Sequence, residues 1–304
     1  MKVIITGGAG FIGSHVVDRL MSEGHEAVIL DNFSTGNRDF VNRAAAVVEA
    51  DICDSDAVGS AFQEHKPEAV FHLAAMVDLR ASIEDPKRSH AVNVEGSRNI
   101  INASKQAGVK KIIFSSSAAV YGDNQNLPIK ETEPINPSSP YGEQKAQTEQ
   151  DLKESGIASI ILRYANVYGP RQGTVGEGGV VAIFCKKLAH TEPLKIFGDG
   201  KQTRDFVYVS DVAAANCAAL SSTQNFGIYN IATGAETSVN ELADLLLSLS
   251  QKDTTMEHTE RVAGEVLRSS LDAAAAVQTL GWEAGVSTKE GLEETWQWFK
   301  NASF

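Results

Sequence analysis

The sequence predicts an α/β protein, with a doubly wound parallel sheet covered by helices on both faces and a smaller C-terminal lobe. Over the first half of the chain, near-continuous apolar segments of strand length alternate with helical segments, as in a parallel sheet buried on both faces. A glycine-rich turn joins the first strand to the first helix. After residue 166 the alternation loosens into glycine-rich loops and short strands, which predicts the second lobe.

The elements follow one another in a regular order. The strands of the sheet are expected at the apolar runs KVIIT (2–6), EAVILD (26–31), AAAVVEAD (44–51), EAVFHLAA (68–75), KKIIFSSS (110–117) and ASIILRYAN (158–166). Helices are expected between them at 11–23, 55–65, 85–106 and 141–155. Pro86 in the first turn and Gly108 just past the end delimit the third of these helices. Later elements are expected as strands at 194–200, 206–209 and 227–232 and as helices at 180–190, 210–220, 238–250 and 287–300.

Composition limits the possible functions. The chain has 304 residues, of which 42% are hydrophobic and 22% are charged, as in a globular protein. Its formal net charge of −12 argues against a surface for nucleic acid or anionic membrane. Cys53, Cys185 and Cys217 match no metal or redox spacing, so no metal site is predicted. Met1 leads directly into the first strand and no apolar run could span a bilayer, so we expect a cytoplasmic protein.

The loop GGAGFIG (7–13) predicts a dinucleotide site. Gly7, Gly10 and Gly13 stand where side chains would obstruct a sharp strand-to-helix turn, an approaching pyrophosphate or the helix–strand contact. The positive N-terminal end of the following helix would face the phosphates. A glycine triplet alone is also compatible with a tight turn that binds nothing, but here a strand precedes it and a helix follows.

Acidic residues at the ends of the next two strands extend this site. Asp31 ends the second strand and is followed by Asn32; its carboxylate would accept hydrogen bonds from the adenosine ribose and repel a 2′-phosphate. This favours NAD over NADP as the cofactor. Asp51 and Ile52 end the third strand, where they would either meet the adenine or simply cap the strand.

Tyr141 and Lys145 lie four residues apart on a predicted helix and therefore share a face. An ammonium group near a phenol stabilises its ionised form, which turns a tyrosine into a usable general base. The same spacing also occurs on exposed helix faces. A dinucleotide loop in the same chain favours a functional Tyr–Lys pair over an exposed helix face.

The spacing GxxGxxG together with YGEQK (141–145) resembles the extended branch of the short-chain dehydrogenase/reductase superfamily. Within this branch the chain is similar to the NAD-dependent nucleotide-sugar epimerases, and above all to those that act at C4 of UDP-glucose and UDP-galactose. The similarity spans almost the whole chain, through TGGAGFIGSH (6–15), DN (31–32), DI (51–52), FHLAA (71–75), NVEGS (93–97), FSSSAAVYG (114–122), SPYGEQK (139–145), LRYANVYGPRQ (162–172) and IFGDGKQTRDFVYVSDVA (196–213).

The resemblance implies a two-domain organisation of the chain. Residues 1–166 would form a Rossmann-type NAD-binding domain, to which residues 206–232 would return. Residues 167–205 and 233–304 would form the substrate-binding lobe. Beyond the residues already named, the implied cofactor contacts are Phe11, Ile12, Leu73, Ala74, Ala75, Asn93, Ser115 and Tyr164.

The resemblance also assigns catalytic roles. Tyr141 would take a proton from a sugar hydroxyl, Lys145 would hold the nicotinamide ribose and tune Tyr141, and Ser117 would hydrogen-bond the reacting oxygen. Related 4,6-dehydratases carry an Asp-Glu pair directly after the catalytic Ser or Thr, and related decarboxylases carry a glutamate there. This chain has Ala118 and Ala119, which favours epimerisation. A departure is Val77, where many 4-epimerases have a lysine near the cofactor phosphates.

The substrate contacts implied by the resemblance lie mainly in the second lobe. Arg204 would bind the diphosphate and Asn166 would contact the same region, since arginine binds phosphate through two hydrogen bonds. The backbone of Ile196 and Phe197 and the loop before Val180 would hold the uracil.

A second arginine in the family lies three residues before an acidic residue. Here Arg261 lies four residues before Glu265, so either this shift is tolerated or Arg268 serves instead; Arg261 is also compatible with a plain surface charge. Counting from Glu265, Ser269 would line the pocket beside the sugar's 2-substituent. A small residue there resembles the pattern of enzymes that also accept N-acetyl sugars, although the shifted arginine allows Ser269 to face elsewhere.

The leading hypothesis is therefore an NAD-dependent UDP-hexose 4-epimerase, an isomerase that works through a transient 4-keto sugar. The alternatives are a UDP-uronic acid 4-epimerase, a keto-sugar reductase or, outside catalysis, a cofactor-sensing regulator on the same fold. By analogy with the superfamily, helices 85–106 and 141–155 would pair with their copies in a homodimer.

Overall fold

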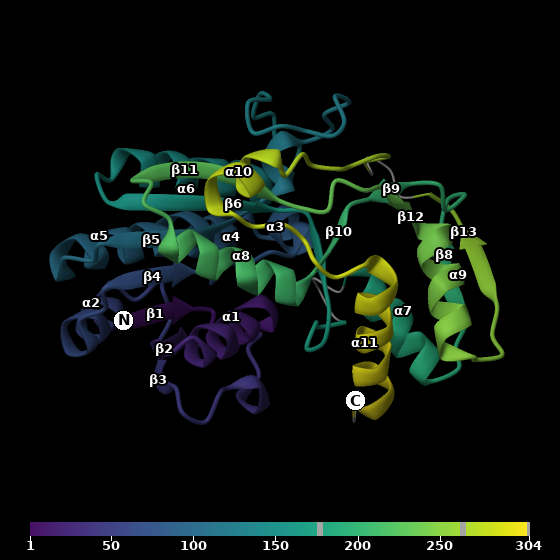
Figure 1. Ribbon diagram of the computed structural model, residues 1–304, viewed down its shortest axis with the longest axis horizontal. Coiled ribbons are helices and arrows are strands. Elements are labelled where there is room, and N and C mark those ends of the chain that lie inside the picture. The colour runs from purple at the N-terminus through teal and green to yellow at the C-terminus, as the bar shows by residue number, and fades with distance from the viewer. Residues whose placement is uncertain (175–178, 262–265, 303–304) are drawn as a thin grey trace.

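A single parallel sheet organises the N-terminal part of the computed structural model, which describes residues 1–174, 179–261 and 266–302 (Figure 1). Its seven strands lie in the order β11-β6-β5-β4-β1-β2-β3, and every neighbouring pair is parallel. The strand bounds are β1 Lys2–Thr6, β2 Glu26–Asp31, β3 Ala46–Glu49, β4 Ala69–His72, β5 Lys111–Ser117, β6 Ala158–Tyr164 and β11 Phe226–Ile231. The predicted fold class is confirmed, and all six strands expected before residue 166 are present.

Alternating residues of the strands face opposite layers of helices. Val3 and Ile5 of β1 are fully buried in one apolar cluster, whereas Ile4 between them belongs to another. The first cluster is covered by α1 (Phe11–Ser22) and α8 (Val209–Ser221). The second is covered mainly by α2 (Ser55–His65) and α5 (Ser97–Ala107), with α6 (Pro140–Glu154) beside them. The two-sided burial explains why the strands are apolar at nearly every position.

The helix predicted over 85–106 is present and contains a π-helical segment in its middle. It consists of α4 (Pro86–His90), a π-helical segment (Ala91–Gly96) and α5. The Asp85 side chain caps it at Arg88 N, and Gly108 ends it with a φ of +70°. The predicted helix is therefore present, but its middle is π-helical; there the carbonyl of Asn93 accepts from Ser97 Oγ at 2.6 Å and from Thr148 Oγ1 at 3.0 Å.

The second lobe packs around its own apolar core. Helices α7 (Val180–Ala189), α9 (Val239–Ser250) and α11 (Thr288–Asn301) enclose buried residues such as Phe184, Leu246 and Trp296. Three short two-stranded sheets accompany them: β7 (Asn166–Tyr168) with β10 (Phe206–Tyr208), β8 (Leu194–Phe197) with β13 (Met256–Thr259), and β9 (Thr203–Arg204) with β12 (Thr237–Ser238).

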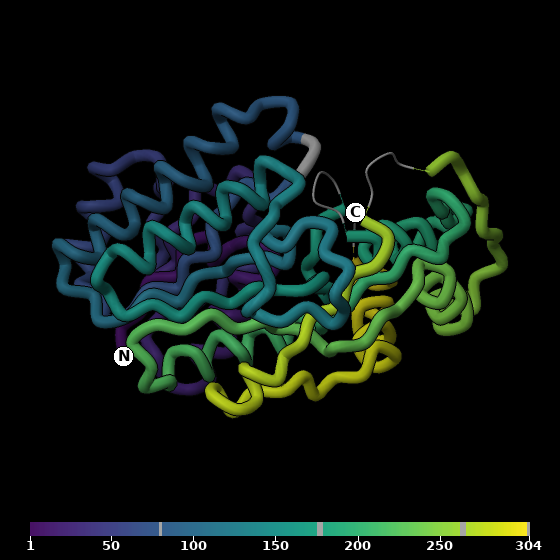
Figure 2. Tube along the Cα trace, turned by 90° about the horizontal axis from the view of Figure 1, so that it is seen from above, coloured from purple at the N-terminus to yellow at the C-terminus, as the bar shows by residue number. Residues whose placement is uncertain are grey.

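The chain passes more than once between the two lobes. It enters the second lobe after β6, returns for α8 and β11, and leaves again for α9, as the view from above shows (Figure 2). The short helix α10 (Ala274–Leu280), which the sequence did not indicate, packs near β11 before the chain reaches α11. The domain limits predicted from the sequence are not tested by these contacts and stay a prediction.

Further short elements were also not predicted. Helix α3 (Leu79–Glu84) and the 3₁₀ turn η3 (Ala118–Tyr121) follow the ends of β4 and β5, while a second 3₁₀ turn, η1 (Arg38–Phe40), follows β2. Within the described part of the chain, no helix is long and apolar enough to cross a membrane.

A buried histidine links the middle strands to the helix that contains the π-helical segment. His72 lies between Thr6, whose Oγ1 is 2.8 Å from its Nδ1, and Ser97, whose Oγ is 2.8 Å from its Nε2. Ser97 donates its own proton to Asn93 O, so it must accept from His72 Nε2–H. Nδ1 then accepts from Thr6, which in turn accepts from Ala74 N–H at 3.1 Å. The imidazole is therefore neutral and fully hydrogen-bonded.

His72 should make the protein sensitive to acid. Burial, with a smaller contribution from the charge of Lys145, lowers the pKa of His72 from 6.5 to about 3. Between these values the unfolded chain binds a proton that the folded chain does not, so stability falls as the pH falls. We expect a loss on the order of 3 kcal/mol from this group between about pH 7 and about pH 4.

Urea unfolding at a series of pH values measures this effect. His72→Gln should lower stability at neutral pH but flatten its decline toward acid, whereas the exposed control His90→Gln should keep the wild-type slope. Equal slopes for wild type and His72→Gln would contradict the prediction.

Candidate active site

The glycine loop is closed so tightly that side chains would not fit. A Cβ on Gly13 would lie 2.0 Å from Gly7 O, and one on Gly7 would lie 2.8 Å from Ala74 N. Gly7 also has a φ of +70°, which disfavours any other residue. The loop therefore brings the start of α1 against both its own turn and the end of β4.

The loop leaves the start of α1 available to an anion. Gly10 is the N-cap residue, no side chain caps the helix, and its first turn has no acidic residue. Uncapped N–H groups at a helix start, beside a turn of bare backbone, fit the pyrophosphate of a dinucleotide. Phe11 and Ile12 are the first helical residues, and both are partly exposed.

Asp31 supports this loop directly. Its Oδ2 accepts from Ala9 N at 2.9 Å and its Oδ1 accepts from Phe33 N at 2.8 Å, while its side chain is largely buried. The carboxylate at the end of β2 thus fixes the glycine loop, and its remaining lone pairs are suited to ribose hydroxyls.

The residues predicted at the adenine end form a second local network. Asn32 Nδ2 donates to Asp51 Oδ2 at 2.9 Å, and Cys53 N donates to Asp51 Oδ1 at 2.8 Å. Burial acts to raise the pKa of Asp51, but these hydrogen bonds outweigh it and lower the pKa. Ile52 is buried against Gly96, where a Cβ would lie 2.7 Å from Ile52 Cγ1.

The exit of β4 is held from two sides. Leu73 N and Ala74 N donate to the backbone and side chain of Thr6, and Ala75 follows them, partly exposed. Further on, buried Asn93 fixes Met76 by accepting from its N–H at 2.7 Å and donating to its carbonyl at 2.9 Å. Asn93 thus orients the segment after β4, whose contact with a cofactor stays a prediction.

The predicted catalytic residues converge at the end of β5. Ser139 caps α6 at Gly142 N, which places Tyr141 in the first turn and Lys145 one turn later. Lys145 Nζ donates to Ser115 O at 2.6 Å and lies 5.7 Å from the centre of the Tyr141 ring. Ser117 ends the same strand, and its Oγ accepts from Ala119 N at 3.1 Å. Strand, turn and helix therefore bring these groups to one place.

Tyr164 closes the same region from β6. It is buried, its hydroxyl accepts from Asn216 Nδ2 at 2.8 Å, and burial raises its pKa well above the ordinary range for tyrosine. A neutral, hydrogen-bonded phenol of this kind is suited to packing and orientation, which leaves Tyr141 as the candidate base.

A buried carboxylate that the sequence did not indicate, Asp205, lies next to two of the predicted substrate residues. Asp205 is buried and accepts from Thr233 N, Thr233 Oγ1, Gly234 N and Leu271 N, at 2.9, 2.7, 2.9 and 3.3 Å. Its backbone carbonyl accepts from Asn166 N at 2.9 Å, and Arg204 precedes it. Burial raises the pKa of Asp205 even though these donors act to lower it.

The predicted uracil contacts lie on the second lobe. Ile196 is fully buried in its core, so only the backbone of this residue can face a ligand, whereas Phe197 is 45% exposed. Phe197 O accepts from Gln202 Nε2 at 3.0 Å. Val180 begins α7 and is partly exposed, and Gly179 before it supplies no side-chain cap.

The two candidate phosphate arginines differ in their surroundings. Arg268 makes two hydrogen bonds to the carboxylate of Glu236, at 3.0 and 2.6 Å, so its charge is already compensated. Arg261 is exposed and passes Gly198, whose Cβ would lie 3.5 Å from it, and it makes no ion pair with any described residue. These surroundings favour Arg261 over Arg268 as the candidate phosphate ligand, and the assignment stays a prediction. Glu265, from which Ser269 was located, lies outside the described residues; Ser269 itself is partly exposed.

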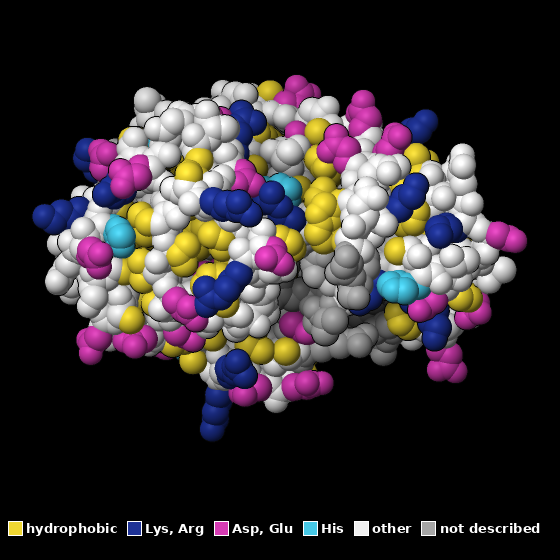
Figure 3. Space-filling view, turned by 90° about the horizontal axis from the view of Figure 1, so that it is seen from below, with side chains coloured by type: hydrophobic (Ala, Val, Ile, Leu, Met, Phe, Trp, Pro, Cys, Tyr) yellow, Lys and Arg dark blue, Asp and Glu magenta, His cyan; other side chains and the backbone are white. Residues whose placement is uncertain are grey.

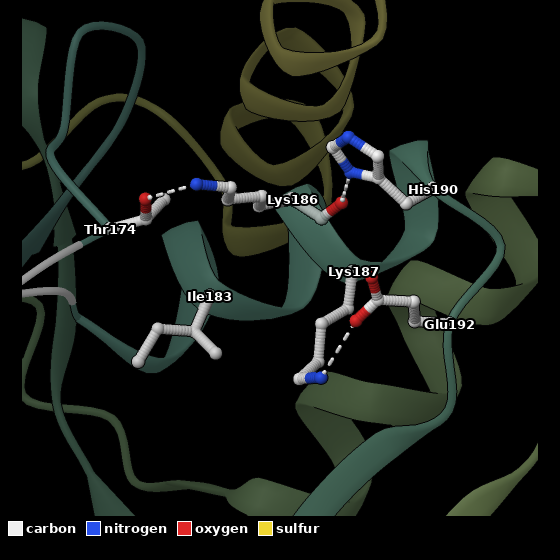
Figure 4. A pocket seen from close by; sticks show the side chains of 6 residues that line it. All are labelled: Thr174, Ile183, Lys186, Lys187, His190 and Glu192. Carbon is white, nitrogen blue, oxygen red and sulfur yellow. Dashed lines mark hydrogen bonds and ion pairs between the residues drawn. The ribbon is translucent and has the colours of Figure 1, made fainter. Parts of the chain in front are cut away.

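The pocket drawn in Figure 4 lies apart from the candidate active site. It lies at the C-terminal half of α7 and includes no predicted site residue. Lys187 is paired with Glu192 at 3.1 Å and Lys186 donates to Thr174 at 3.3 Å, so both lysines of this pocket already have protein partners. On the underside of the molecule, acidic and basic side chains are interspersed (Figure 3).

A glycine cradle at a helix start, an acidic residue ending the second strand and a Tyr–Lys pair facing the end of β5 define a class of NAD-dependent enzymes that act on alcohols. The chain belongs to the NAD dependent epimerase/dehydratase family, whose model matches residues 3–232.

The chain is also similar over its whole length to several solved structures of nucleotide-sugar epimerases. UDP-glucose 4-epimerase from Thermotoga maritima, determined with UDP-glucose, is 44% identical with a TM-score of 0.95, covering 98% of each chain. UDP-glucose 4-epimerase from Thermus thermophilus, in complex with NAD, is 37% identical with a TM-score of 0.94 over 100% of each chain. UDP-N-acetylglucosamine 4-epimerase from Methanobrevibacter ruminantium M1, in complex with UDP-N-acetylmuramic acid, is 34% identical with a TM-score of 0.92, covering 98% of this chain and 97% of that one.

Asp31→Asn should weaken NAD binding about tenfold or more and narrow the preference for NAD over NADP. The amide cannot accept from Ala9 N and Phe33 N while also bonding a ribose, and it no longer repels a 2′-phosphate. Calorimetric titration of the cofactor-free chain with both dinucleotides measures this, with the exposed Asp39→Asn as the matched control. Equal affinity of the wild type for NAD and NADP would show that the assignment of Asp31 is wrong.

Proposed function

We propose that the protein is an NAD-dependent UDP-hexose 4-epimerase, an isomerase of the UDP-glucose 4-epimerase type. The observation that carries the proposal is that Lys145 lies beside the Tyr141 ring and bonds the carbonyl of Ser115 at the end of β5. The same strand ends at Ser117, where Ala118 and Ala119 follow instead of acidic residues. Such a site is equipped to oxidise an alcohol and reduce the ketone again. It has no acid or base in that turn for eliminating water.

Tyr141 serves as the proton carrier. Its phenol takes the proton of the sugar's 4-hydroxyl and returns one to the same oxygen later. Lys145 is buried, and its Nζ lies 5.7 Å from the centre of the Tyr141 ring, where a positive charge stabilises an ionised phenol. Ser117 contributes a hydroxyl that orients the reacting oxygen.

The glycine loop with Gly7, Gly10 and Gly13 would hold the pyrophosphate of NAD, and Asp31 would hold its ribose. When bound there, NAD would supply a hydride acceptor for the sugar carbon and, once reduced, a hydride donor to the opposite face. Because the hydride and the proton taken from the sugar are both returned to it, net oxidation is zero and the cofactor can stay bound. The chain's own part in the chemistry is orientation and charge.

The nucleotide end of the substrate anchors the sugar while its ring turns over. Arg204 and Arg261 bind the diphosphate, Asn166 lies beside it, and Phe197 contacts the uracil. The anchoring fits their positions on the second lobe and at its junction with the sheet. A strong hold on the diphosphate leaves the sugar free to present either face.

The resemblance further leads us to propose a homodimer through α5 and α6. The outward residues of these helices include Asn102, Lys105 and Gln150, and Arg98 pairs with Asp151 across the two helices at 2.8 Å. The proposed contact is therefore polar.

Incubation of the purified protein with a panel of UDP-sugars, followed by proton NMR without added NAD, tests the function. We expect UDP-glucose and UDP-galactose to interconvert. Conversion of UDP-glucuronic acid alone, or turnover only with added NADPH, would favour the uronic acid epimerase or the keto-sugar reductase instead.

Tyr141→Phe removes one hydroxyl and keeps the ring. Turnover should fall by roughly 10²–10⁴-fold, the usual size of a general-base contribution, while the fold and NAD binding are retained. Single-turnover reduction of the bound cofactor by UDP-glucose measures the chemical step. A rate within about tenfold of the wild type would remove Tyr141 from this role.

Ser269→Tyr tests which sugars fit. We propose that Ser269 leaves room for an acetamido group, so that the wild type also interconverts UDP-GlcNAc and UDP-GalNAc; the UDP-N-acetylglucosamine 4-epimerase named above supports this. The tyrosine ring should suppress the N-acetyl reaction selectively. Equal loss of both reactions, or no N-acetyl activity in the wild type, would contradict the role of Ser269 without affecting the epimerase proposal.

A further inference from the structure

A buried ion pair lies directly beneath the predicted catalytic residues. Glu149 of α6 and Arg163 of β6 are both almost completely buried. Arg163 Nε donates to Glu149 Oε1 at 2.9 Å and its Nη2 donates to Oε2 at 2.6 Å, which makes a two-pronged contact. A buried pair of this kind contributes little net stability compared with apolar residues, so its position invites a functional explanation.

The pair also holds the end of β5. Ser116 Oγ donates to Glu149 Oε1 at 2.5 Å, and Ser116 directly precedes Ser117. One turn earlier on α6, Lys145 bonds the carbonyl of Ser115. Helix α6 is thus fastened at two points to the three residues that end the strand.

Helical spacing makes this arrangement directional. Tyr141, Lys145 and Glu149 follow at intervals of four and therefore lie on one face of α6. Lys145 and Glu149 are fixed to β5 and β6 by hydrogen bonds. The position of Tyr141, one turn nearer the start of the helix, follows from theirs. A shift of the helix along or away from the strand would separate Tyr141 from Ser117.

A second connection runs from Arg163 to the edge strand β11. Its Nη1 donates to Tyr121 Oη at 2.9 Å, and Tyr121 donates to Asn230 Oδ1 at 2.8 Å. Asn230 Nδ2 in turn donates to the carbonyls of Ile129 and Asp272, at 2.9 and 3.1 Å. Every member of the network is hydrogen-bonded, as a rigid support requires.

We propose that Glu149 and Arg163 are positioning residues that hold α6 against β5, so that Lys145 stays beside Tyr141 and Tyr141 stays beside Ser117. The expected change in turnover rests on the proposed function. The expected change in the ionisation of Tyr141 is independent of it. The charged or titratable groups that face the network are Glu131 and Tyr121 beside Asn230, and His72 beside Lys145. Burial raises the pKa of Tyr121 to about 12, and His72 stays neutral, so neither changes charge near neutral pH.

The decisive variant is the double substitution Glu149→Leu with Arg163→Met, which removes both charges together and avoids leaving one unpaired. We expect a folded protein with wild-type NAD content and a KM within about twofold of the wild type. The value of kcat should fall roughly tenfold to a hundredfold, as small displacements of catalytic groups do. Tyr141 should also ionise at higher pH, because Lys145 is held less closely to it.

The ionisation of Tyr141 is read from the near-ultraviolet absorbance of tyrosinate, as the difference between each variant and the same variant carrying Tyr141→Phe. Ser116→Ala keeps the ion pair and removes only the hydrogen bond to the strand, so it should produce the same changes in smaller size even if the double variant fails to fold. Asp151→Asn is the matched control, since it breaks the ion pair with Arg98 on another face of α6 and should leave Tyr141 unchanged.

Wild-type titration of Tyr141 in Ser116→Ala and in any folded double variant would overturn the proposal. The same change in Asp151→Asn would also overturn it, since the effect would then be a general weakening of the helix. If no UDP-sugar is converted by the wild type but the titration shifts as expected, the proposed function fails while the positioning role stands.

Discussion

The attachment of α6 to the end of β5 is the contact on which the site depends. Lys145 reaches the carbonyl of Ser115 at 2.6 Å, and Glu149 holds Ser116 one turn further on. A general base is useful only where its proton donor can sit, so the helix must be fixed to the strand that carries Ser117. The parallel sheet makes this possible, because all of its strands end at the same edge.

The edge of the sheet where the strands end must also keep a fixed position relative to the second lobe. Asp205 supplies this connection by collecting backbone donors from the loop after β11 and from Leu271, while its carbonyl holds Asn166. Arg204 and Asn166, two of the residues proposed for the diphosphate region, therefore lie next to buried Asp205 at the junction of the lobes. A substrate bound by its nucleotide on one side can then be acted upon from the other.

The sequence was most informative where the signal is local. Apolar runs predicted the strands of the sheet, and the bare loop at 7–13 predicted the crowded turn around Gly7 and Gly13. It was least informative where contacts join distant segments. Nothing near Asn93 indicates that Thr148 contacts its carbonyl and that the helix there is π-helical. Polar residues within otherwise apolar strands, such as Arg163 in β6, were the available signal for the buried networks, but their partners lie on other elements.

The central claim is that this one site removes a hydride from the sugar and returns the same hydride to it. UDP-glucose labelled with deuterium at C4 of the sugar tests this most directly when the product is examined by NMR in ordinary water with unlabelled NAD added. We expect UDP-galactose that retains its deuterium at C4, with none transferred to the added NAD or to solvent. Loss of the label to either would contradict it.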